Sequence, residues 1–283
     1  MLGGGHDGGG TLNWRNTVKG MMMGVVETVP GVSSSTIAML LGIYENVIHA
    51  IHTLTTNEYK RAIRFLLPIG VGILVGLGLT ISVISYLLEH FPIPIGFLFI
   101  GLIVGMLPFI WRDGLASVRQ QVYSFPQVML MIGCILFLVM LNGVVGADAR
   151  VMMELTFSDY VYLFIAGWFA STALVLPGMS GALILVILGV YETALLALTT
   201  FELPVVIAIG SGVVVGILIM GKVVRFILTR YRRTTYAAIF GLLSGSVFIV
   251  FPGLPVTVME WVVSSCLFVG GSVFTFQVSS KKG

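Results

Sequence analysis

Two polar motifs interrupt a very apolar chain and combine residue types that bind anions. The sequence Pro-Gly-Val-Ser at 30–33 returns as Pro-Gly-Met-Ser at 177–180, with each residue displaced by 147 positions. Proline ends a helix, glycine permits a sharp turn, and serine then opens the next helix. Free N–H groups and hydroxyls at such a turn favour a negatively charged ligand, and phosphate fits best. The candidate ligand residues are Ser33, Ser34, Ser35, Thr36, Ser180 and Gly181, and the turn residues are Pro30, Gly31, Pro177 and Gly178.

Three charged residues precede the first motif. Glu27 lies about 4.5 Å of helix before Pro30, at a depth where an isolated carboxylate is costly. It must be paired, protonated or hydrated, so it is either a coupling group for an ion gradient or a structural partner of the hairpin backbone. Lys19 and Arg15 lie eight and twelve residues earlier on the same helical face, where they can line an access path for an anionic head group.

The elements that position these residues must be membrane helices. Of the 283 residues, 57% are hydrophobic and only 10% are charged, and the mean hydropathy is +1.06. This composition excludes a soluble domain, and the net charge of +3 gives no indication of nucleic-acid binding. The fold class that we predict is an all-α polytopic membrane protein.

The duplicated motif predicts a duplicated fold. Residues 1–12 form a Gly-rich head that we expect to be disordered, 13–147 a first repeat, and 148–283 a second repeat with a basic tail. Each repeat holds one Pro-Gly segment and three apolar runs near the roughly 20 residues that span a bilayer. If each Pro-Gly segment is a re-entrant hairpin, each repeat crosses the membrane three times, and the two repeats have inverted topology. Paired broken helices of this kind mark transporter binding sites near the midplane.

The distribution of basic residues supports this topology. Every Lys and Arg except Arg150 then falls on one side, which the positive-inside rule names as cytoplasmic. We therefore predict a multi-pass protein of the bacterial cytoplasmic membrane with both termini inside.

Pairs of glycines recur in the apolar runs after the hairpins, now at an offset of 140. Such small residues let transmembrane helices approach closely. The pairs are Gly70, Gly72, Gly76, Gly101 and Gly105 with Gly210, Gly212, Gly216, Gly241 and Gly245.

Other polar residues in the hairpin segments are expected to have structural roles. Glu45 and Glu192 each lie about 18 Å of helix beyond the tip serine, back near an interface. His49 and His52 lie at the exit of the first hairpin, and a metal site there would need further ligands. The sequence therefore indicates no metal and no cofactor, although coupling to a proton or sodium gradient is compatible with it.

The run from Lys19-Gly20 through Glu27 to Thr36, together with the second motif from Leu176 to Gly181, resembles a bacterial membrane family assigned to polyprenyl-phosphate transport. The resemblance covers nearly the whole chain except its Gly-rich head. It implies a flippase that returns undecaprenyl phosphate, the carrier lipid of cell-envelope synthesis, across the membrane by alternating access.

A second resemblance supplies a rival function. Glu27 and the Pro-Gly-Val-Ser-Ser-Ser-Thr run are similar to the signature of undecaprenyl-diphosphate phosphatases, which also use inverted repeats. Those enzymes carry Ser-Arg-Ser after the second motif, whereas this chain has Ser180-Gly181-Ala182. The missing arginine counts against phosphoryl transfer, which needs cationic stabilisation. A secondary transporter of a small soluble anion is a further alternative.

Overall fold

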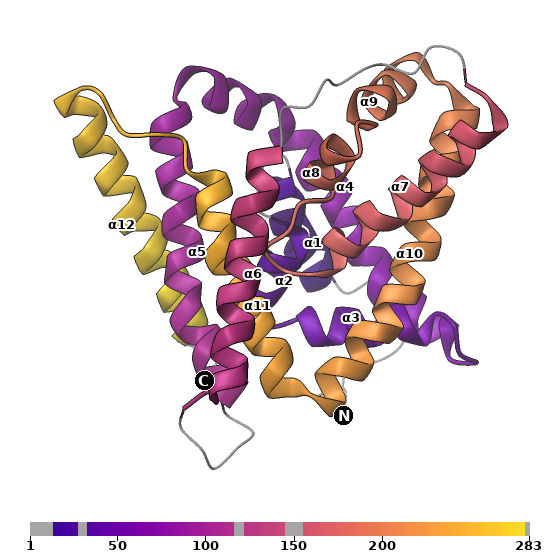
Figure 1. Ribbon diagram of the computed structural model, residues 1–283, viewed down its shortest axis with the longest axis horizontal. Coiled ribbons are helices and arrows are strands. Elements are labelled where there is room, and N and C mark those ends of the chain that lie inside the picture. The colour runs from indigo at the N-terminus through magenta and orange to yellow at the C-terminus, as the bar shows by residue number, and fades with distance from the viewer. Residues whose placement is uncertain (1–13, 28–32, 116–121, 145–154, 281–283) are drawn as a thin grey trace.

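The computed structural model describes residues 14–27, 33–115, 122–144 and 155–280, and all the regular elements in these ranges are helices (Figure 1). The prediction of an all-α polytopic fold is confirmed. Twelve helices are present in the described ranges: α1 (Trp14–Glu27), α2 (Ser34–Leu40), α3 (Tyr44–Thr53), α4 (Tyr59–His90), α5 (Pro92–Leu115), α6 (Phe125–Val144), α7 (Phe157–Val175), α8 (Gly181–Ile187), α9 (Tyr191–Thr200), α10 (Leu203–Arg230), α11 (Arg232–Val250) and α12 (Val258–Ser280).

Six described helices are long and apolar enough to cross a bilayer: α4, α5, α7, α10, α11 and α12. The sequence predicts six crossings too, but with α6 in place of α7. The apolar stretch of α6, Phe125–Leu141, is shorter than the other six. The first arm of the second hairpin, α7, runs obliquely from the edge of the molecule towards its centre (Figure 1).

Both short helices that follow the motifs, α2 and α8, end at a glycine. We expected Glu45 and Glu192 to lie about 18 Å of continuous helix beyond the tip serines. This is wrong, because each returning helix ends after seven residues. Gly42 and Gly189 follow with φ of 66° and 68°, the left-handed conformation in which glycine ends helices. The bend between α8 and α9 is 117°. Glu45 and Glu192 therefore lie in the first turns of α3 and α9, beyond the bend.

Glycines let the first hairpin arm of each half lie directly against the long helix that follows. A side-chain carbon on Gly72 of α4 would lie 2.1 Å from the carbonyl oxygen of Thr17 in α1, and one on Gly212 of α10 would lie 2.0 Å from that of Phe164 in α7. Two residues earlier, a side-chain carbon on Gly70 or Gly210 would meet no atom of another element within 4 Å. The glycine pattern was thus informative, but not every paired glycine lies in a helix contact.

The other long helices pair across the two halves of the chain. Helix α12 packs against α5, α6 packs against α11, and α5 and α11 meet in the middle (Figure 1). A side-chain carbon on Gly101 would lie 2.2 Å from the Phe268 carbonyl oxygen, and one on Gly241 would lie 2.6 Å from the Met131 carbonyl oxygen. The last helix of each half therefore packs against the other half: α6 against α11, and α12 against α5.

The close approach of α1 and α4 gives a stability prediction. Gly72→Ala should lower the thermal unfolding temperature by several degrees, because overpacking of this kind costs about 1–3 kcal/mol. Gly70→Ala is the matched control on the same helix and should leave the temperature unchanged or raise it slightly. Equal unfolding temperatures for the two variants would contradict the α1–α4 packing.

Basic side chains gather at one edge of the molecule. Arg230 ends α10, Arg232 begins α11 and Arg112 lies in the last turn of α5. Figure 1 shows these helix ends along the lower edge, together with α3, whereas α9 lies at the upper edge. The arrangement agrees with a single basic face, and its assignment to the cytoplasm stays a prediction.

Candidate functional site at the hairpin tips

The tips of the two hairpins touch. The backbone N–H of Gly178, in the second tip, donates a hydrogen bond of 3.1 Å to Thr36 Oγ1 at the start of α2. The Tyr44 hydroxyl, at the start of α3, donates a 3.0 Å bond to the carbonyl oxygen of Val175, the last residue of α7. Two segments more than 130 residues apart are thereby held together in the middle of the fold.

Gly178 has no room for a side chain. Its φ is +89°, and an added carbon would lie 2.8 Å from the carbonyl carbon of Leu242 and from the N atom of Leu243 in α11. The second tip therefore presses directly on the α11 backbone. Pro177 precedes it in the turn, whereas Pro30 and Gly31 of the first tip lie outside the described residues.

The hydroxyls of the first tip form a buried network. Ser33 Oγ lies 2.7 Å from Ser35 Oγ and 3.3 Å from Thr36 Oγ1, and all three residues are at most 6% exposed. Each hydroxyl can act as donor or acceptor, so the network can rearrange around an incoming acceptor. In the present structure these hydroxyls bond to one another and to the second tip.

Glu27, the last residue of α1, contacts the start of α2. Its Oε2 accepts a 2.9 Å hydrogen bond from the Ser34 backbone N–H and a second bond from the Ser34 hydroxyl. The carboxylate therefore accepts a hydrogen bond from a backbone N–H at the start of α2, which is the kind of donor that we expected to bind the ligand. The equivalent position in the second half, 147 residues on, is Leu174. Among the residues described, only the first tip has a carboxylate that accepts hydrogen bonds from the start of the following helix.

The remaining predicted site residues are less closely gathered. Ser180 occupies the position before α8 and is half-buried, and Gly181 begins that helix. Lys19 and Arg15 lie on α1 at about 12 and 18 Å along the helix axis from Glu27, too far for direct contact with it. Lys19 is half-buried and Arg15 is exposed, so their role in an access path stays a prediction.

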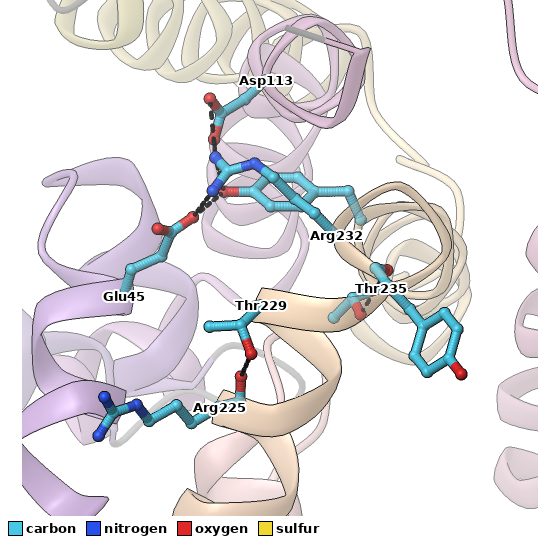
Figure 2. Close-up of polar contacts among 8 residues, drawn as sticks. Glu45, Asp113, Arg225, Thr229, Arg232 and Thr235 are labelled. Carbon is cyan, nitrogen blue, oxygen red and sulfur yellow. Dashed lines mark hydrogen bonds and ion pairs between the residues drawn. The ribbon is translucent and has the colours of Figure 1, made fainter. Parts of the chain in front are cut away.

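A charged cluster that we did not predict lies beside the first hairpin (Figure 2). Arg232 Nη1 is 2.7 Å from Glu45 Oε1, and Arg232 Nη2 is 3.4 Å from Asp113 Oδ2. The hydroxyl of Tyr236 accepts a 3.2 Å bond from Arg232 and donates a 2.9 Å bond to Glu45. Arg225, at the end of α10, points away from the cluster in Figure 2.

A cavity of about 490 Å³ lies between this cluster and α2. Its lining residues are Met39, Leu41, Gly42, Tyr44, Glu45, Asn46, Phe109, Asp113, Arg232 and Tyr236. Among these residues, only Glu45 stood out in the sequence, because it recurs as Glu192. Positions 140 residues before Arg232 and Tyr236 are Pro92 and Gly96, so comparison of the repeats could not reveal these two residues.

A second cavity, of about 240 Å³, lies on the other side of α3 and includes His49, Glu58 and Arg61 in its lining. Burial, followed by the nearby Arg225 and Lys222, lowers the pKa of the His52 imidazole on the same helix. The described part of the chain holds no group of three His, Cys, Asp or Glu side chains that could bind a metal. This region has a positive electrostatic character that suits anionic head groups.

Comparison with known proteins identifies the family. The family described as "VCA0040-like: Undecaprenyl phosphate translocase-like" matches residues 23–266. A polyprenyl-phosphate transporter of Staphylococcus aureus (strain NCTC 8325 / PS 47) is 36% identical over 270 residues, which cover 93% of this chain and 94% of that protein. A polyprenyl-phosphate transporter of Vibrio cholerae serotype O1 (strain ATCC 39315 / El Tor Inaba N16961) is 31% identical over 253 residues, covering 84% of this chain and 78% of that protein. No solved structure matches the chain significantly. The chain therefore belongs to the undecaprenyl phosphate translocase-like (VCA0040-like) family.

Proposed function

We propose that this protein moves undecaprenyl phosphate between the two leaflets of the bacterial cytoplasmic membrane. The names of its relatives support a polyprenyl phosphate as the substrate. The observation that carries the proposal is the contact between the two hairpin tips, where Thr36 and Gly178 meet beside a network of hydroxyls. The phosphate passes between the tips, and the polyprenyl chain stays in the lipid.

The chemistry of the tips suits a phosphate that binds and leaves again. Ser33, Ser35 and Thr36 offer hydroxyl donors, and Gly178 offers a backbone N–H that now bonds to Thr36. The tips must separate before a phosphate can reach these groups, because the three hydroxyl residues are buried. Binding is thereby linked to movement of one half of the molecule against the other, as alternating access requires.

Glu27 gives this site a means of releasing its ligand. Its carboxylate and the phosphate are both anions that accept hydrogen bonds from the start of α2, so they compete for Ser34. Protonation of Glu27 removes the repulsion, and loss of that proton restores it. A proton gradient can in this way favour binding on one side and release on the other.

The rival phosphatase function finds little support at the tips. The described tip residues provide hydroxyls, backbone N–H groups and one carboxylate, whereas transfer of a phosphoryl group needs cations close to the transferring oxygens. Arg232 is held by Glu45 and Asp113 outside the tips.

Liposomes that contain the purified protein and polyprenyl phosphate test the proposal. A membrane-impermeant probe reports exchange of the monophosphate between leaflets, and a parallel sample with the diphosphate reports release of inorganic phosphate. We expect exchange without release. Release without exchange would make the protein a phosphatase, and uptake of inorganic phosphate without lipid exchange would make it a carrier of a soluble anion.

A further inference from the structure

The cluster around Arg232 joins elements from both halves of the chain. Arg232 is the first residue of α11, whereas Glu45 lies in the first turn of α3 and Asp113 near the end of α5. A single guanidinium therefore connects the second half to the first hairpin and to the long helix behind it (Figure 2). Any motion that separates α11 from α3 must break the contact between Arg232 and Glu45.

The cavity beside the cluster extends from the surface towards the tips. At its outer end the side chains of Arg232 and Glu45 are 32% and 47% exposed. At its inner end lies Met39, which is 3% exposed and only one helical turn beyond Thr36. Tyr44, on the cavity wall, bonds to the residue that precedes the second tip. The charged cluster thus stands at the mouth of a cavity that leads to the proposed phosphate site.

The charges of the cluster argue against a resting place for phosphate. Two carboxylates share one guanidinium, so the cluster has a formal charge of −1 and repels an anion while its contacts are intact. Arg232 becomes available to an anionic head group only when its carboxylate partners separate from it. The cluster is therefore suited to closing a path rather than to storing the ligand.

The other half of the chain has no equivalent cluster among the described residues. The positions that correspond to Arg232, Tyr236 and Asp113 are Pro92, Gly96 and Gly253. At Gly96 a side-chain carbon would lie 2.5 Å from Pro252 Cγ, so this side is closed by apolar packing. Helix α2 is almost wholly buried, whereas most residues of α8 are half-exposed.

We infer that Arg232, Glu45 and Asp113 form a latch that closes the path to the hairpin tips at the edge where α5 ends and α11 begins. Opening of this path requires the contact between Arg232 and Glu45 to break. The latch deepens the proposed transport function, because it identifies the gate on one side of the membrane.

Access to the cavity can be measured without any transport assay. In a background with Cys134 and Cys266 replaced by alanine, Met39→Cys places a thiol at the inner end of the cavity. The rate at which a membrane-impermeant maleimide labels this thiol reports how often the latch opens. Arg232→Gln should raise the rate on the order of tenfold, and Glu45→Gln should raise it by a smaller factor, since one hydrogen bond to Arg232 can remain.

Arg233→Gln is the matched control, since it removes the same charge from the next residue, whose guanidinium contacts the Val122 carbonyl oxygen and the Tyr123 ring. It should leave the labelling rate unchanged. Arg232→Lys keeps a cation between Glu45 and Asp113 and should label more slowly than Arg232→Gln, a rescue that a general loss of folding would not allow. Unchanged labelling in both Arg232→Gln and Glu45→Gln would overturn the latch. Absence of lipid exchange in the wild type would instead overturn the proposed function and leave the labelling result intact.

Discussion

Replacing Gly178 by alanine is expected to reduce transport more than tenfold. The backbone conformation at φ +89° disfavours alanine by about 1 kcal/mol or more. The added carbon would also lie 2.8 Å from backbone atoms of Leu242 and Leu243, so the tip must move away from α11. That movement breaks the hydrogen bond from Gly178 to Thr36 on which the contact of the tips depends.

Gly253→Ala separates the local strain from the effect at the tips. Gly253 has φ of +99°, but an added carbon there meets no atom within 4 Å. Alanine at position 253 is disfavoured by the same left-handed backbone conformation, but this position lies away from the tips. The variant should therefore transport at close to the wild-type rate. The measurement is leaflet exchange of polyprenyl phosphate in liposomes at matched protein content. Equal rates for the two alanine variants would show that the position of the second tip does not matter.

Glu27→Gln is expected to make binding of polyprenyl phosphate tighter at neutral pH and to remove the part of its pH dependence that comes from Glu27. Two unit charges about 8 Å apart repel by about 2 kcal/mol at an effective dielectric constant near 20, which corresponds to at least a tenfold change in affinity. Glutamine keeps an oxygen that can accept the hydrogen bonds from Ser34, so the hairpin should fold normally. Because the ligand is then retained, transport driven by a proton gradient should slow to the rate seen without a gradient.

The control for Glu27→Gln is Glu192→Gln. Glu192 is an exposed carboxylate in the first turn of α9, so its removal changes the net charge by the same amount without altering the tips. Affinity is measured over a range of pH with the purified protein, and transport is measured with and without an imposed gradient. A Glu27→Gln variant that keeps the gradient dependence of the wild type would exclude Glu27 as the coupling group.

The duplicated motif made much of the architecture predictable. The offset of 147 residues predicted that a new helix starts after each Pro-Gly motif, and the first residues of α2 and α8, Ser34 and Gly181, are 147 positions apart. The bends after these helices were missed, although Gly42 and Gly189 both follow a short apolar helix in the repeated motif. A glycine at this position is a common signal for a helix end, and it could have been used.

The charged cluster could not have been predicted by the same reasoning. Arg232 and Glu45 are 187 residues apart, and Arg232 has no counterpart in the first half. Their contact depends on how α11 packs beside α3 and α5, which is a property of the assembled helices. The partner of Glu27 was only partly predictable. A hydrogen bond to the hairpin backbone was one expectation, and Oε2 accepts that bond from the Ser34 N–H, while the coupling role of Glu27 stays a prediction.

The central claim is that phosphate binds between the two tips, and the affinity of a tip variant tests it most directly. Polyprenyl phosphate binding is compared among the wild type, the double variant Ser33→Ala with Ser180→Ala, and a control with Ser158→Ala and Ser211→Ala, whose serines are exposed away from the tips. Each hydroxyl at the tips contributes about 1 kcal/mol, so the tip variant should bind about 30-fold more weakly, with an unfolding temperature close to that of the control. Wild-type affinity in the tip variant would contradict the site.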